Sequence, residues 1–167
     1  QGRYRTFTPL ARQAERFPLY EEYVANMPEG REVIVWSTND YLGMGVVPEV
    51  QDAAIAAIRE HGAGAGGTRN IAGTSPLHNQ LEAELAALHG KEAGLLFISG
   101  YVSNQASLQT ILTSMPGWIC FSDRLNHASM IAGIKGARGS QTVIFEHNDL
   151  QDLEAKLAAA PADAPKL

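Results

Sequence analysis

Apolar residues recur along this chain with two different periods, which predict helices alternating with short strands. Ile55 and Ile58 stand at helical spacing in a segment that Pro48 opens and Gly62 ends. The next helix follows Ser75, a typical N-cap residue, and has one leucine-rich face. The predicted helices cover residues 48–61, 76–89, 101–113, 127–137 and 150–160. Continuous apolar runs of strand length predict strands at 33–36, 93–99, 118–122 and 142–146.

This alternation predicts an α/β fold with a mostly parallel sheet flanked by helices, because helical crossovers join parallel strands. The run at 93–99, AGLLFIS, is apolar throughout, as expected for a strand buried on both faces. Residues 1–32 mix charge, aromatics and proline without a period and predict an irregular N-terminal segment. The closing residues, DAPKL, predict the start of a further strand.

Length and composition limit the class of protein. A chain of 167 residues can bury one core, and its 45% hydrophobic and 19% charged residues are ordinary for a globular domain. A net charge of -5 offers no basic surface for nucleic acid or an anionic membrane. The single cysteine, Cys120, excludes an internal disulfide and favours a cytoplasmic location. The missing initiator methionine and the abrupt end predict a piece of a longer chain.

The stretch HGAGAGGTRNIAGT, residues 61–74, is the densest local signal. It contains the spelling G-x-G-x-x-G, but a helix precedes it where a dinucleotide fold needs a strand. A phosphate-binding P-loop is excluded as well, since Thr68 and Arg69 follow Gly67 without a lysine. The glycines instead permit positive φ and close approach of the backbone to a ligand or to another backbone. The polar residues at its end therefore indicate a small-molecule site.

Two junctions between a strand and a helix carry further candidate chemistry. At Ser99-Gly100-Tyr101, free amides and the helix dipole could hold a phosphate, although an ordinary β–α turn has the same sequence features. At the end of the strand at 118–122, His127 could stack on a flat cofactor ring or simply cap a helix. The other histidines lack metal-site spacing, so no metal is expected; they are His61, His78, His89 and His147.

Four motifs in this order resemble the α-oxoamine synthases, fold-type-I enzymes that use pyridoxal 5'-phosphate (PLP). They are NDYLGMG (39–45), GAGAGGTRNIAGT (62–74), LHGKEAGLLFISGYVSN (88–104) and SDRLNHASMIAGIK (122–135). Within the family, Thr68-Arg69-Asn70 and RYRTF (3–7) are most similar to the branch that makes the heme precursor 5-aminolevulinate. The resemblance implies condensation of glycine with succinyl-CoA, releasing CoA and CO2. A branch using another acyl-CoA, or a non-catalytic fragment, is the alternative.

The resemblance also implies roles for individual residues. Gly100 and Tyr101 match the cradle of the PLP phosphate, with Asn104 nearby, and His127 matches the ring that stacks on the cofactor. Asn39 matches a residue close to the glycine carboxylate, and Ser122 a further substrate contact. Arg5, Thr68 and Asn70 match the group that receives the succinyl carboxylate. The Arg5 guanidinium suits this role because it can bind a carboxylate through two charge-assisted hydrogen bonds. Gln141 stands where relatives often carry a basic residue that contacts CoA.

The same resemblance implies what lies outside this chain. PLP needs a Schiff-base lysine, and none of Lys91, Lys135, Lys156 and Lys166 has the family context for it. Residues 1–47 would form an N-terminal segment with a short strand, and residues 48–167 the first part of a truncated PLP-binding large domain. Family members are homodimers with shared active sites, which predicts that the glycine-rich loop serves the partner subunit.

Overall fold

The computed structural model describes residues 7–24, 27–115 and 117–167, and its contacts divide the chain into two compact units, Gln1–Thr74 and Ser75–Leu167. The predicted assignment of residues 48–167 to one cofactor-binding domain stays a prediction. Within the described residues, no helix is both long and apolar enough to cross a membrane.

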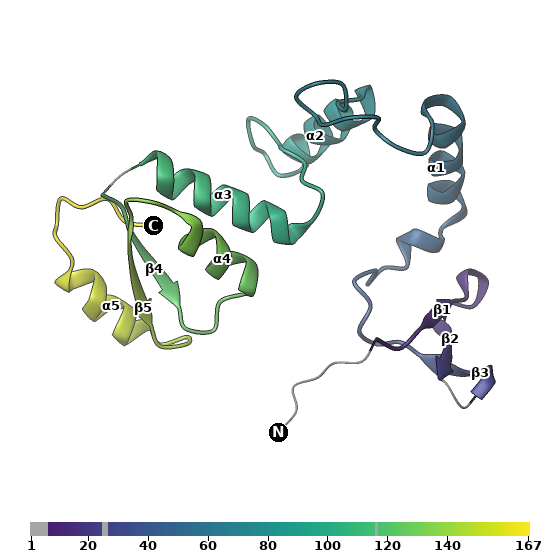
Figure 1. Cartoon of the computed structure of the whole chain (residues 1–167), viewed down its shortest axis with the longest axis horizontal. Coiled ribbons are helices and arrows are strands. Elements are labelled where there is room, and N and C mark those ends of the chain that lie inside the picture. Colours follow the sequence, from purple (N-terminus) through teal and green to yellow (C-terminus); the bar gives the residue numbers. More distant parts are fainter. Residues whose placement is uncertain (1–6, 25–26, 116) are drawn as a thin grey trace. The chain divides into compact units, whose positions relative to one another are not determined.

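The first unit contains a small antiparallel sheet in the order β1–β2–β3 (Figure 1). Its strands are β1 (Leu10–Arg12), β2 (Leu19–Val24) and β3 (Met27–Ile34). Two short 3-10 turns and one helix complete the unit: η1 (Ala14–Arg16), η2 (Met44–Val46) and α1 (Pro48–His61). The helix begins and ends where the sequence predicts, with Pro48 in its first turn and Gly62 at its C-cap.

The prediction of an irregular segment over residues 1–32 is wrong for residues 10–24 and 27–32, and the strand predicted at 33–36 ends at Ile34. The sheet has little apolar alternation, and polar side-chain contacts add to its backbone ladder. Glu22 and Arg31 stand directly opposite each other on β2 and β3 and form an ion pair. Gln13 also donates to Glu21 at 2.7 Å. Such cross-strand pairs stabilise a sheet without the hydrophobic period on which the prediction depends. The first six residues of the predicted segment lie outside the described residues.

The second unit carries the alternating helices and strands. They are α2 (Pro76–Leu88), α3 (Gly100–Ser114), β4 (Ile119–Asp123), α4 (Ala128–Gly136), β5 (Gln141–Phe145) and α5 (Leu150–Ala159). β4 and β5 pair in parallel, and residues 165–167 pair in parallel with β4 as well. This confirms the parallel arrangement and the strand start predicted at DAPKL. Ser75 caps α2 as predicted, in a capping box that it shares with His78.

The core of this unit forms where α3 and α4 pack against each other and against β4. Leu112, Cys120 and Ile134, one from each element, are buried together. Burial raises the pKa of the Cys120 thiol, which keeps it a neutral, apolar group. Gly133 of α4 permits the close packing, because a Cβ at this position would lie 2.7 Å from the Gln105 carbonyl oxygen of α3.

The strand predicted at 93–99 is wrong for this structure. The segment joins no ladder among the described residues, and Leu95 and Ile98 remain 68% and 94% exposed. The Glu82 carboxylate of α2 contacts its backbone and accepts from the Leu96 amide at 2.7 Å. An apolar run indicates where a strand could be buried, but the ladder requires a neighbouring strand to accept its hydrogen bonds.

Candidate functional site

The carboxyl end of β4 and the N-termini of α3 and α4 bring together most of the predicted cofactor residues. Ligands collect at such places in parallel α/β sheets because strand ends and helix N-termini meet there. Ser122 lies buried near the end of β4, and its hydroxyl accepts from the Asn126 side-chain amide at 2.8 Å. The next residue, His127, is the N-cap of α4.

The N-terminus of α3 is open. The Ser99 hydroxyl accepts from the Val102 amide at 3.2 Å and satisfies one of the free N–H groups of this helix end. The amides of Gly100 and Tyr101 lie in the same first turn. A Cβ at Gly100 would meet no atom within 4 Å, so no other described segment packs against this position. This geometry suits an anion that the amides and the helix dipole can bind.

His127 is held by contacts from both helices. Its Nδ1 accepts from the Ser129 amide at 3.2 Å and lies 2.6 Å from the Ser129 hydroxyl oxygen. The Asn104 side-chain amide donates to that hydroxyl at 3.1 Å. Tyr101 approaches the imidazole edge-on, with ring centroids 6.2 Å apart. The structure therefore joins Asn104 to His127 through Ser129, a fully buried residue that the sequence prediction missed, and Tyr101 contacts the His127 ring directly.

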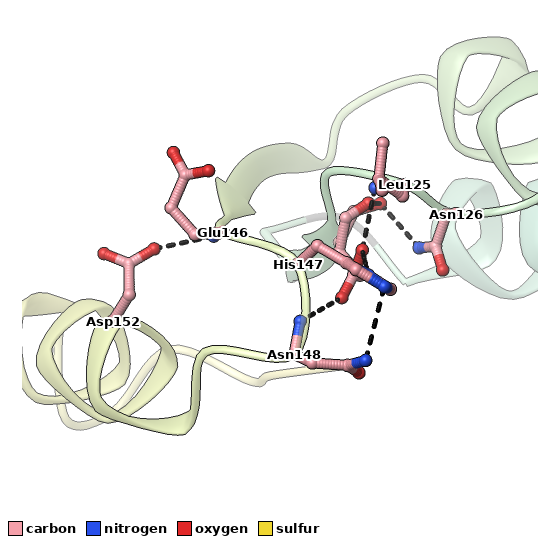
Figure 2. Close-up of polar contacts among 8 residues, drawn as sticks. Leu125, Asn126, Glu146, His147, Asn148 and Asp152 are labelled. Atoms are coloured by element: carbon pink, nitrogen blue, oxygen red, sulfur yellow. Dashed lines mark hydrogen bonds and ion pairs between the residues drawn. The ribbon is translucent and has the colours of Figure 1, made fainter.

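A polar cluster beside this site closes the loops after β4 and β5 (Figure 2). Asp123 accepts from the Leu125 and Asn148 amides at 2.7 and 3.0 Å and contacts His147 Nδ1 at 3.0 Å. The two backbone amides, with a smaller effect from His147, hold the pKa of the Asp123 carboxyl below its usual range. One carboxylate thus ties together the two loops at the carboxyl edge of the sheet.

This cluster predicts acid-sensitive stability. Because the pKa of Asp123 is lower in the folded state, its contribution is fully present above the unfolded pKa near 4 and is lost as the pH falls through the folded value. We expect Asp123→Asn to lower the melting temperature at pH 7, and the difference from wild type to shrink below about pH 4. Asp163→Asn, at an exposed carboxylate, is the matched control. A deficit that is equally large at pH 7 and pH 3 would contradict this assignment.

The first unit holds the other predicted substrate residues that the structure describes. Asn39 precedes Asp40, whose carboxylate binds the Arg12 guanidinium and the Gly45 amide. Arg12, with a smaller contribution from that amide, holds the pKa of the Asp40 carboxyl below its usual range. Asp40 thereby anchors the turn that carries Asn39 to β1. Arg5 lies outside the described residues.

In the glycine-rich loop, Thr68 and Asn70 contact each other, since the Thr68 hydroxyl donates to the Asn70 side-chain oxygen at 2.6 Å. The Thr68 carbonyl accepts from Ile71, Ala72 and Gly73 at 3.1, 3.2 and 2.8 Å. Gly73 lies so close to Gly67 that a Cβ would come within 2.0 Å of the Gly67 carbonyl oxygen. The predicted close approach of two backbone segments is therefore confirmed within this loop.

Three residues that hold the candidate site residues in place were not among the predicted ones: Ser129, Arg12 and Asp40. Ser129 had a local signal, because a serine two residues after His127 at a helix start can join the cap. Arg12 and Asp40 are 28 residues apart, and their contact had no local signal in the sequence.

Residues 31–167 match the family Aminotransferase class I and II, and the chain belongs to this family. Among curated proteins it is similar to the 5-aminolevulinate synthase of Rhizobium meliloti (strain 1021), with 57% identity over the whole chain and 41% of the relative. The corresponding enzyme of Bradyrhizobium diazoefficiens is 54% identical over the whole chain and 40% of that protein. The chain thus spans about two fifths of the length of these relatives.

Among solved structures, the fold is similar to that of a Sphingomonas wittichii serine palmitoyltransferase. The TM-score is 0.79 at 30% identity, over 89% of this chain and 35% of that one. These findings confirm the predicted resemblance and the α/β fold class, part of a fold-type-I transferase large domain.

Proposed function

We propose that the protein carrying this chain condenses glycine with succinyl-CoA to 5-aminolevulinate, CoA and CO2, using PLP. The observation that carries this proposal is the 57% identity to a 5-aminolevulinate synthase across all 167 residues. It is supported by the contacts that bring Asn104 and His127 to one buried hydroxyl and Tyr101 to the His127 ring.

The residues at the second unit's site fit PLP. The open first turn of α3 would bind the phosphate through the amides of Gly100 and Tyr101, without a basic side chain. Asn104, one turn further along α3, holds Ser129 and through it His127, whose ring would lie against the cofactor. When bound, PLP supplies an electron sink for chemistry at the α carbon of the amino acid.

The substrate residues belong to different parts of the chain. Asn39 would lie near the glycine carboxylate, in a turn that Asp40 anchors. Thr68 and Asn70 would bind the succinyl end together with Arg5, and Ser122 would make a further contact. In this assignment the chain's own residues bind and orient the two substrates; the lysine that bonds to PLP is not among them.

Arg5 makes the acyl preference testable. Charged hydrogen bonds contribute roughly 1.5 to 3 kcal/mol, so we expect Arg5→Leu to weaken use of succinyl-CoA by about 10- to 100-fold and to spare glycine. Steady-state kinetics with succinyl-CoA and with butyryl-CoA, which lacks the terminal charge, measures the effect. Arg3→Leu in the same segment is the matched control. An unchanged preference between the two thioesters in Arg5→Leu would remove Arg5 from the acyl site.

The direct test of the proposal uses the full-length protein with PLP, glycine and a panel of acyl-CoA thioesters. Rapid CoA release with succinyl-CoA supports it, whereas slow release beside rapid release with acetyl-CoA favours another α-oxoamine synthase. No CoA release with any thioester would favour the alternative hypothesis, that the chain is a non-catalytic fragment. An intact mass near 18.0 kDa for the natural protein would also support it.

We further propose a cytoplasmic homodimer in which the glycine-rich loop of one subunit serves the site of the other. Glycines let two backbones approach closely, and the contact between Gly67 and Gly73 is an example within one chain. A native mass equal to one full-length subunit would contradict the shared site. Fractionation that recovers the protein outside the cytoplasm would contradict the location.

A further inference from the structure

The hydrogen bonds around His127 have a direction that fixes where its ring carries a proton. The backbone amide of Ser129 can only donate, and it points at Nδ1 from 3.2 Å. The Ser129 hydroxyl lies 2.6 Å from the same nitrogen and already accepts from the Asn104 amide at 3.1 Å. Its own proton is therefore available to Nδ1. With two donors aimed at it, Nδ1 acts as an acceptor, and the neutral ring carries its proton on Nε2.

Packing between α3 and α4 keeps this chain of bonds in place. Ser129 is fully buried and cannot exchange its partners for water. One turn along α4, Gly133 lies against Gln105, the residue that follows Asn104 on α3. The absence of a side chain at Gly133 brings the two helices close enough for the Asn104 amide to reach the Ser129 hydroxyl.

We propose that Ser129 is a positioning residue for His127. It relays the hydrogen bond of Asn104 to Nδ1, so that the ring is held in a T-shaped contact with Tyr101 and carries its proton on Nε2. The role at the cofactor rests on the proposed function, but the relay itself does not. Ser129 touches neither cofactor nor substrate in this assignment and acts only through His127.

Reversing the polarity of the relay tests it most sharply. Asn104→Asp keeps the size of the side chain but replaces the donor with an acceptor, which turns the Ser129 proton towards residue 104. The serine oxygen then faces Nδ1 with a lone pair and favours a proton on that nitrogen. We expect ¹⁵N NMR of histidine-labelled, PLP-loaded full-length protein to detect Nε2–H at His127 in wild type, with a measurable Nδ1–H population in Asn104→Asp.

Two comparisons separate the relay from charge alone. Gln109→Glu adds one negative charge to α3 more than one turn away from Asn104, and it should leave the His127 signals unchanged. In a Ser129→Ala background, Asn104→Asp should no longer alter them, because the connecting hydroxyl is gone. An Asn104→Asp variant with wild-type signals would overturn the relay. So would a change of equal size with and without the Ser129 hydroxyl.

Cofactor retention is the second readout. Ser129→Ala loses one hydrogen bond to the ring but keeps the backbone donor, so we expect PLP to dissociate roughly 3- to 10-fold more readily. Thermal melting of the PLP-free variant checks that the fold is intact. If the NMR result is as expected but removal of PLP leaves the His127 signals unchanged, the relay is supported and the proposed place of His127 at the cofactor fails.

Discussion

Gly73→Ala is expected to lower kcat/KM for succinyl-CoA by about 100-fold, the scale of a misplacement of roughly 1 Å at an active site. The added Cβ would lie 2.0 Å from the Gly67 carbonyl oxygen, 2.6 Å from its carbon and 2.9 Å from the Thr68 carbonyl carbon. All three are backbone atoms, so no side chain can rotate away. The loop must open, which moves Thr68 and Asn70 from the positions proposed for the acyl carboxylate.

The same loop offers a matched control. A Cβ at Gly64 would meet nothing within 4 Å, so Gly64→Ala should keep activity within about twofold and can stabilise the loop slightly through the unfolded state. Steady-state kinetics on both full-length variants, with thermal melting to confirm folding, provides the comparison. Equal activities for the two variants would show that the close approach of Gly67 and Gly73 is not needed for function.

The helices of this chain could be predicted almost to the residue because local signals set their ends. Pro48 and Gly62 bound α1, and Ser75 with His78 forms the capping box that opens α2. These signals depend on a few neighbouring residues, so they do not depend on the rest of the fold. The parallel pair β4 and β5 was predictable for a similar reason, since each strand is a short apolar run between two helices.

The strands that the sequence misassigned depend on partners distant in the chain. The sheet of β1, β2 and β3 is stabilised by polar contacts across strands, such as Glu22 with Arg31, and these have no period. Conversely, residues 93–99 have the composition of a buried strand but join no ladder within the described residues. An apolar composition shows that a segment is compatible with a buried strand. The hydrogen-bonded ladder forms only when a neighbouring strand is present.

The residues of the candidate site also differ in how far the sequence alone can indicate them. His127, Asn104 and Ser122 became candidates because they belong to recognisable motifs, and the structure holds two of them in one network. Ser129 holds His127 and Asn104, and Asp40 holds the turn that carries Asn39, through hydrogen bonds that form only once the chain has folded. Arg12 reaches Asp40 across 28 positions of sequence. Sequence motifs therefore indicate the candidate site residues more readily than the residues that hold them in place.

Gly133→Ala is expected to destabilise the protein by about 1 to 3 kcal/mol, although alanine is the better helix former. The new Cβ would lie 2.7 Å from the Gln105 carbonyl oxygen, 3.1 Å from its Cα and 3.0 Å from the Leu108 Cβ. Backbone atoms of α3 cannot turn aside, so the helices must separate. That separation would loosen the core around Leu112 and lengthen the bond from Asn104 to Ser129.

Gly136→Ala, one turn further along α4, is the decisive comparison, because the same change meets a different neighbour. Its Cβ would lie 2.8 Å from the end of the Gln109 side chain, which can rotate away. We therefore expect a change in unfolding free energy near zero, or a gain of a few tenths of a kcal/mol. Chemical denaturation of both full-length variants measures the difference. If Gly133→Ala were as stable as Gly136→Ala, α3 and α4 would not need their close contact, and the packing that holds His127 would have to lie elsewhere.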